Sequence, residues 1–135
     1  MRWQKSLLAM LKERENKSIA LAIDTSQLPA RPMLLQNIVK LFQEVRPDTM
    51  LVQADFKIRN VSPIGTAKIK YYKHGKSSYT EVFEWADQEK IDTVFYITDV
   101  TGYFYEELKV NAEVFWLIPD EYLPRVPFGK AIRVA

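Results

Sequence analysis

The sequence predicts an α/β fold with three layers: a Rossmann-like, mostly parallel sheet with one antiparallel edge strand and helices on both faces. The main observation is an alternation along the chain. Short, nearly continuous apolar runs, typical of strands buried on both faces, are separated by longer segments with apolar residues at helical spacing. The chain has 135 residues, of which 47% are hydrophobic and 27% charged, as in one soluble globular domain.

The first half of the chain alternates helix and strand. Residues 2–14 are predicted to form an amphipathic helix, because their apolar side chains recur three and four positions apart. Residues 18–24 form a nearly continuous apolar run, which predicts a strand buried on both faces. Pro32 is suited to the first turn of a helix over 32–45, and the apolar residues 50–54 predict the next strand.

The second half begins with a hairpin-like excursion over residues 56–72. Its bend is expected at 63–65, which contains a proline and a glycine, and 67–72 is predicted to be the antiparallel edge strand. Apolar residues at helical spacing predict a helix over 79–88. Three further apolar runs predict the remaining strands, at 93–98, 113–118 and 130–134.

Composition excludes several classes of site. The chain has no cysteine, so disulfides, thiolate metal sites and a cysteine nucleophile are absent, and His74 is its single histidine. The apolar run Leu7–Leu11 is too short for a secretory signal or a membrane span, so we expect a cytoplasmic protein. Charge is divided unevenly along the sequence: residues 1–80 carry a net charge of +8 and residues 81–135 carry −6. Such a division is typical of a surface whose electric field attracts and orients a charged partner.

Aspartates follow three of the predicted strands: Asp24, Asp55 and Asp99. The carboxyl ends of parallel strands meet at one edge of a sheet, where ligands bind if the strand order reverses. Ser26 lies two residues after Asp24, and hydroxyl and carboxylate oxygens are ligands that Mg²⁺ prefers. Polar residues also end strands simply because the chain emerges into solvent there, so each aspartate alone has an alternative explanation.

The segment Ile19–Ser26 resembles the first strand and the Asp-x-Ser motif of a von Willebrand factor A (VWA) domain. Over about 115 residues, the chain resembles the bacterial VWA-like family usually found C-terminal to a metallopeptidase-like segment. We therefore divide it into an N-terminal amphipathic helix, 1–17, and a VWA-like domain, 18–135. The matching residues, in order, are Asp24-Thr25-Ser26, Asp55, Ser77, Val82-Phe83-Glu84-Trp85, Thr98-Asp99, Phe115-Trp116 and Pro127-Phe128-Gly129.

The resemblance implies a metal-ion-dependent adhesion site at which Mg²⁺ is held by Asp24, Ser26, Ser77 and Asp99. A partner's acidic side chain or peptide would complete the metal shell. The sequence departs from the family pattern at Leu28, which occupies the second serine position, and Lys76 could pair with a site aspartate in place of the ion. Further residues expected at the rim of the site are Asp55, Lys76, Ser78, Gly102 and Tyr103.

The function predicted from these residues is a non-catalytic protein-interaction domain with no catalytic residues. One alternative is a metal-dependent, nuclease-like phosphoryl-transfer enzyme using Asp24, Asp55 and Asp99. It is disfavoured because ribonuclease H-like folds join their first two strands by a hairpin, whereas helix 32–45 intervenes here. A second alternative is nucleic-acid binding through the basic segment 57–76, which edge-strand lysines and a modest pI of 8.8 disfavour.

Overall fold

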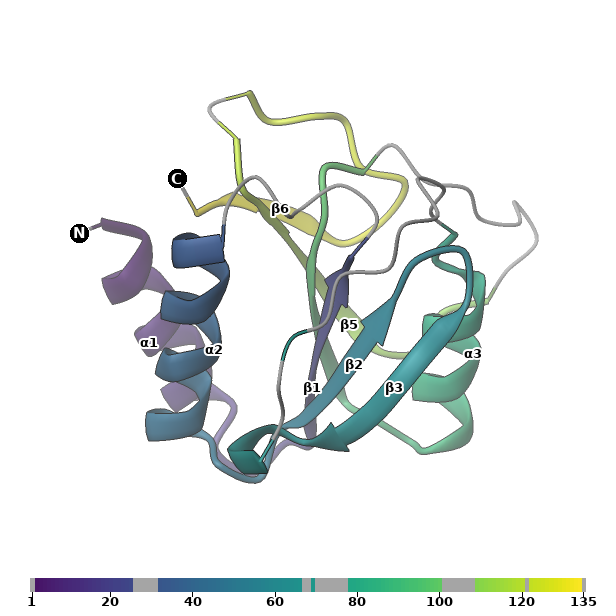
Figure 1. The fold of residues 1–135 in the computed structure, drawn as a ribbon, viewed down its shortest axis with the longest axis horizontal. Helices are drawn as coiled ribbons and strands as arrows, with labels where there is room; N and C mark the ends of the chain where they lie inside the picture. The colour runs from purple at the N-terminus through teal and green to yellow at the C-terminus, as the bar shows by residue number, and fades with distance from the viewer. Residues whose placement is uncertain are drawn as a thin grey trace.

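The computed structural model describes residues 2–25, 32–66, 69, 78–100, 109–120 and 122–134. Within these residues six strands form one sheet, in the spatial order β3-β2-β1-β4-β5-β6 (Figure 1). All neighbouring pairs are parallel except β2 and β3. The strands are β1 (Ile19–Asp24), β2 (Met50–Ala54), β3 (Ile58–Pro63), β4 (Thr93–Ile97), β5 (Glu113–Ile118) and β6 (Lys130–Arg133).

Helices cover both faces of this sheet. The helices α1 (Arg2–Glu13) and α2 (Pro32–Val45) lie together on one face, and α3 (Thr80–Gln88) lies on the other (Figure 1). The predicted three-layer arrangement is therefore confirmed, and so is the reversal of strand order beside the first strand, since β1 lies between β2 and β4. None of the helices described is long and apolar enough to cross a membrane.

The antiparallel strand of the described sheet comes earlier in the sequence than the segment expected for it. We expected it at residues 67–72, but the strand that pairs antiparallel with β2 is β3, Ile58–Pro63. The chain turns back directly after β2, where the Asp55 backbone N–H donates to the Lys57 carbonyl at 3.0 Å. The expected bend is occupied by a short 3₁₀ helix, Ile64–Thr66. Apart from Ile69, which is not in a strand, residues 67–72 lie outside the described residues.

The two faces of the sheet pack against different kinds of side chain. On the first face, Trp3, Leu7 and Leu11 of α1 join the apolar side of α2 against the long aliphatic and aromatic side chains of the central strands. On the second face, Ala22 is the residue that β1 contributes to the apolar cluster, and its side chain is small. This leaves room for a cluster of aromatic rings beneath α3, formed by Tyr79, Phe83, Tyr96, Trp116 and Phe128.

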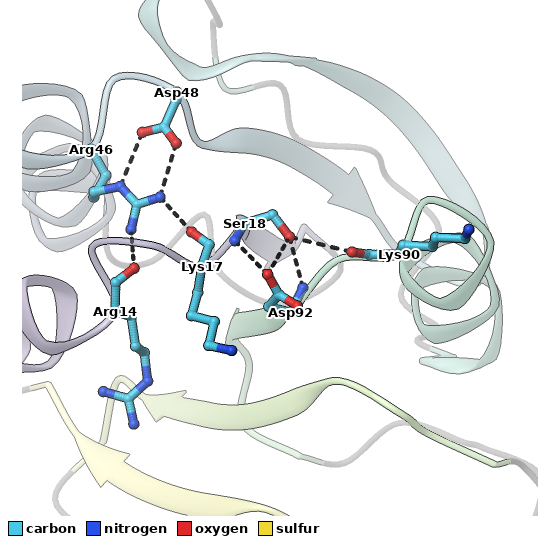
Figure 2. Close-up of polar contacts among 7 residues, drawn as sticks. All are labelled: Arg14, Lys17, Ser18, Arg46, Asp48, Lys90 and Asp92. Atoms are coloured by element: carbon cyan, nitrogen blue, oxygen red, sulfur yellow. Dashed lines mark hydrogen bonds and ion pairs between the residues drawn. The ribbon is translucent and has the colours of Figure 1, made fainter.

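Hydrogen bonds and ion pairs occupy the amino edge of the sheet, where the parallel strands begin (Figure 2). The buried guanidinium of Arg46 donates to the carbonyls of Arg14 and Lys17, at 2.8 and 2.6 Å. Next to it, Ser18 at the start of β1 donates its backbone N–H to the Asp92 carboxylate at 2.8 Å, and the Asp92 N–H donates to the Ser18 hydroxyl at 2.9 Å. These contacts fasten α1 and the start of β1 to the end of α2 and the start of β4.

Candidate functional site

Polar side chains gather at the opposite edge, where the parallel strands end. Asp24 is the last residue of β1, Asp55 follows β2 directly, and Thr98 and Asp99 follow β4. The strand register pairs Asp24 with Ala54 and Ile23 with Ile97, so these polar residues lie at the same level along the sheet. They lie at the point where the strand order reverses, which is the usual ligand-binding position in open α/β sheets.

Asp24 is held by a short chain of buried hydrogen bonds. The Thr98 hydroxyl donates to the Asp24 carboxylate at 2.7 Å. A hydroxyl has one proton to donate, so the bond between Thr98 Oγ1 and the Tyr79 hydroxyl, 2.8 Å long, is donated by Tyr79. Tyr79, Thr98 and Asp24 are each no more than 1% exposed. The Asp24 carboxylate is therefore oriented by Thr98, which directly follows β4, and Thr98 is in turn bonded to Tyr79, which directly precedes α3.

The backbone just after Thr98 is strained, and its conformation adds a further hydrogen bond to the Thr98 hydroxyl. Val100 has a φ of +61°, a left-handed conformation that costs a β-branched residue about 1–2 kcal/mol. In this conformation its backbone N–H donates to Thr98 Oγ1 at 3.2 Å. Glycine adopts such a conformation without strain, because it has no side chain that collides with the backbone. Strained backbone of this kind is concentrated at functional sites.

We expect Thr98→Val to lower the free energy of unfolding by about 1–3 kcal/mol, because it removes two buried hydrogen bonds, the one from Tyr79 to Thr98 and the one from Thr98 to Asp24. Tyr79→Phe should cost only about 0.5–1.5 kcal/mol, since it removes one hydrogen bond and leaves Thr98 bonded to Asp24. Urea unfolding of both variants measures the difference. An equal cost for the two substitutions would contradict this order of the hydrogen-bonded chain.

Tyr96 lies beside this series of hydrogen bonds. Its ring is edge-on to that of Tyr79, at a centroid distance of 5.1 Å. Burial raises the pKa of Tyr96 well above its usual value, and the nearby Asp24 carboxylate raises it further. The Tyr96 phenol is therefore neutral at physiological pH and does not supply a phenolate nucleophile or base. Its hydroxyl has no hydrogen-bond partner in the described part of the chain.

Asp55 is occupied by a salt bridge. The Arg59 guanidinium donates to both Asp55 carboxylate oxygens, from Nε at 2.9 Å and from Nη2 at 3.0 Å. The Asp55 side chain is fully buried, and that of Arg59 is 23% exposed. Burial acts to raise the pKa of Asp55, but the hydrogen bonds from Arg59 and the Lys57 N–H, together with the Arg59 charge, outweigh it and lower that pKa. Asp55 thus stabilises the β2–β3 turn.

The salt bridge predicts a pH dependence of stability. The pKa of Asp55 is lower in the folded than in the unfolded chain, so its stabilisation is present above the unfolded pKa of about 3.9 and is lost as pH falls through the folded value. We expect Asp55→Asn to cost about 1–3 kcal/mol at pH 7 and progressively less below pH 4. Urea unfolding at pH 7, 4 and 3 measures this convergence. Arg59→Gln should converge in the same way, and a constant difference for both variants would contradict the prediction.

The predicted site residues are only partly described. Asp24 and Asp99 lie at the same edge, because Thr98, the neighbour of Asp99, bonds to Asp24. Ser78 lies near Asp55, to whose carbonyl it donates its backbone N–H at 3.0 Å. Sequence reasoning left Tyr79, Thr98 and Arg59 out of the site, although Thr98 is a polar residue directly after an apolar strand. Ser26, Leu28, Lys76, Ser77, Gly102 and Tyr103 lie outside the described residues.

The described residues at this edge fit only in part the Mg²⁺ that the resemblance to VWA domains implies. Carboxylate oxygens from Asp24 and Asp99 have the chemistry that Mg²⁺ prefers. Asp55 does not fit, because Arg59 occupies both of its oxygens, and the Thr98 hydroxyl is used by three hydrogen bonds. Among the described residues, no three His, Cys, Asp or Glu side chains lie together in a way that could hold a metal ion. A complete coordination shell for Mg²⁺ would therefore require oxygen ligands in addition to those of the described residues.

The sheet order, the single antiparallel strand and the polar carboxyl edge define a Rossmann-like α/β domain of the VWA class. Comparison with known families agrees with this assignment: the model of the VWA-like domain family (DUF2201) matches residues 19–135. The chain therefore belongs to the VWA-like domain (DUF2201) family. No curated protein and no solved structure matches the chain significantly.

Proposed function

We propose that this VWA-like domain is a non-catalytic protein-interaction domain that binds a protein partner at the carboxyl edge of its sheet, around Asp24 and Asp99. The observation that carries the proposal is the fixed orientation of the Asp24 carboxylate, which Thr98 and Tyr79 hold at the point of strand reversal. Asp24 is only 1% exposed, so we expect it to act on a partner from beneath this edge, by ordering the groups nearer the surface. A site that is already ordered before binding loses less conformational entropy when a partner docks.

The proposal includes Mg²⁺ as a ligand of this edge. Asp24 and Asp99 would be outer-shell carboxylates, Ser26 would be a direct ligand, and Ser77 would stand in for the threonine of the family pattern. A bound Mg²⁺ would provide a positive charge for an acidic side chain of the partner. Isothermal titration with Mg²⁺ and with Mn²⁺ tests this part: we expect heat of binding at millimolar metal with the wild-type protein and none with Asp24→Asn. Absence of heat with the wild-type protein would reject the metal and leave the interaction domain to be tested separately.

The interaction is tested by affinity capture from a lysate of the organism that encodes the chain, followed by binding measurements with the purified partner. Asp24→Asn, which preserves the shape of the side chain, should weaken capture at least tenfold. Glu44→Gln is a matched control, because Glu44 is an exposed carboxylate near the far end of α2. Capture should be repeated with EDTA to measure the metal contribution. Equal capture by wild-type protein and by Asp24→Asn would reject the proposed surface.

Neither alternative function gains support from a described contact. The phosphoryl-transfer alternative requires Asp55 as a metal ligand, but Arg59 binds both of its carboxylate oxygens. It also expects a hairpin between the first two strands, whereas β1 and β2 are parallel. The nucleic-acid alternative requires cations that can reach phosphates, and the Arg59 guanidinium of the basic segment is engaged with Asp55 and lies over the Phe56 ring at 4.9 Å.

A further inference from the structure

One fully buried hydroxyl near the carboxyl edge takes no part in the contacts given above. In the described ranges of the chain, three buried side-chain hydroxyls have no hydrogen-bond partner: those of Thr49, Thr80 and Tyr96. Thr49 directly precedes β2, at the opposite edge of the sheet, and Thr80 is only partly buried. Tyr96 is 0% exposed and lies in β4, two residues before Thr98. Of these three residues, Tyr96 is therefore the fully buried one that lies next to the candidate site.

The packing of the Tyr96 ring does not explain its hydroxyl. The ring stacks on that of Trp116 at a centroid distance of 5.5 Å and lies edge-on to that of Tyr79. Phenylalanine would keep both contacts. A buried hydroxyl that has left solvent without gaining a partner destabilises a fold, whereas a phenyl ring of the same shape has no such cost. The hydroxyl therefore requires an explanation of its own.

The Tyr96 side chain lies on the same face of the sheet as the Asp24 carboxylate. Residues two apart in extended backbone point to one face, so Tyr96 shares a face with Thr98, and Ala22 shares one with Asp24. The strand register pairs Tyr96 with Ala22, and both belong to the apolar cluster beneath α3 (Figure 1). Burial raises the pKa of Tyr96 most, and of the neighbouring charges that of Asp24 raises it most. The phenol is thus a protonated donor in the field of a carboxylate.

A gap separates this donor from the carboxylate. The Tyr96 hydroxyl has no hydrogen-bond partner, so it does not reach Asp24 directly. The strand positions beside them carry small side chains, because Ala22 is the register partner of Tyr96 and Ala54 is that of Asp24. Polar groups that face each other beyond hydrogen-bond distance are commonly joined by water. Buried water molecules typically make about three hydrogen bonds to polar groups that otherwise lack partners.

From this arrangement we infer that one buried water molecule accepts a hydrogen bond from the Tyr96 hydroxyl and donates one to the Asp24 carboxylate. Tyr96 is then a positioning residue that orients Asp24 through water, whereas Thr98 orients it directly. The inference adds a second group that orders the candidate site. It rests on the proposed function only for its effect on partner binding, because the water site itself is measured in the free protein.

The first test counts internal water molecules by the magnetic relaxation dispersion of solvent oxygen, which detects water held inside a protein for longer than the protein takes to tumble. The whole chain is compared as wild type, Tyr96→Phe and Tyr122→Phe. We expect Tyr96→Phe to hold one water molecule fewer than the wild type. Tyr122→Phe is the matched control, because it removes the same group from a side chain that is 76% exposed, and the count should not change. Equal counts for Tyr96→Phe and wild type would overturn the inference.

Urea unfolding gives an independent result, because the two explanations of the hydroxyl predict opposite signs. If water joins Tyr96 to Asp24, Tyr96→Phe removes hydrogen bonds and should lower the urea midpoint. If the hydroxyl has no partner of any kind, its removal should raise the midpoint or leave it unchanged, which would overturn the inference.

A double-mutant cycle tests whether Tyr96 acts through Asp24. Tyr96→Phe combined with Asp24→Asn should lower stability by less than the sum of the two separate losses, because both substitutions weaken the same link. Thr98 remains in place in all of these variants. Strictly additive losses would assign the Tyr96 hydroxyl to another part of the interior and would overturn the link to Asp24.

Partner binding separates this inference from the proposed function. With the purified partner, Tyr96→Phe should weaken binding about three- to tenfold, which is the loss of one hydrogen bond. If Tyr96→Phe loses the water but Asp24→Asn binds as wild type does, the proposed surface is rejected and the water site stands. If Tyr96→Phe keeps the water count but weakens binding as strongly as Asp24→Asn, the hydroxyl contacts the partner itself. That result would overturn the water site and support the proposed surface.

Discussion

Replacing Trp116 with alanine should lower the free energy of unfolding by about 3–5 kcal/mol. Trp116 is fully buried in β5 and lies in the middle of the aromatic cluster beneath α3. Its ring lies 5.2 to 5.6 Å, between centroids, from those of Tyr79, Phe83, Tyr96 and Phe128. Truncation leaves a cavity among rigid rings, which cannot collapse to fill it.

The indole N–H adds a polar contribution, because Trp116 Nε1 donates to the Phe128 carbonyl at 2.7 Å. Trp116→Phe retains a ring but loses this bond and some volume, so it should cost clearly less than Trp116→Ala. Urea unfolding of both variants measures the two contributions. A loss below about 1.5 kcal/mol for Trp116→Ala would contradict the close packing of the cluster. Because Tyr79 packs on this ring, Trp116→Ala should also weaken the hydrogen bond from Tyr79 to Thr98.

The second large effect is expected at the amino edge, where Arg46→Met should cost about 2–4 kcal/mol. Arg46 is 8% exposed, and its guanidinium binds the carbonyls of Arg14 and Lys17 as well as the Asp48 carboxylate. Methionine fills a similar volume but removes the Arg46 hydrogen bond to the Lys17 carbonyl and leaves the Arg14 carbonyl with only the Lys17 N–H, at 2.9 Å. The substitution should therefore loosen the connection of α1 to the sheet as well as lower overall stability.

Comparison with Asp48 separates the carbonyl bonds from the ion pair. The Asp48 side chain is 63% exposed, so Asp48→Ala should cost at most about 1 kcal/mol. Arg46→Lys keeps the charge but lacks the planar group that reaches several acceptors, and it should recover less than half of the loss. Urea unfolding gives the free energies, and hydrogen exchange of the α1 amides reports the loosening. An equal cost for Asp48→Ala and Arg46→Met would assign the stability to the ion pair instead.

The central strands and helices could be predicted from the sequence because burial determines their pattern. β1 is buried at all six positions and β4 at all five, so each appears as a continuous apolar run. β3 lacks this signal. Its sequence Ile-Arg-Asn-Val-Ser-Pro contains no fully buried position, as an edge strand allows, and it ends in proline. The neighbouring segment 67–72 has the stronger apolar pattern, which explains why the sequence pointed there instead.

The candidate site was predictable only in part, for a different reason. Aspartates at the ends of β1, β2 and β4 can be found by their position after apolar runs. Their partners cannot, because the contacts span 74 residues between Asp24 and Thr98 and 19 between Thr98 and Tyr79. Only the packed sheet brings these groups together. The pairing of Asp55 with Arg59, four residues later, is local, but it depends on the tight β2–β3 turn that the sequence analysis missed.

The helix α1 has a practical consequence for recombinant work. The family match begins at residue 19, but Trp3, Leu7 and Leu11 of α1 are at most 8% exposed and belong to the same apolar cluster as β1 and β4. Burying each such side chain contributes about 1.5–3 kcal/mol. A fragment that begins at residue 19 would expose to solvent the apolar surface that α1 covers, and it should aggregate. Expression plasmids for this domain should therefore retain the codons for α1.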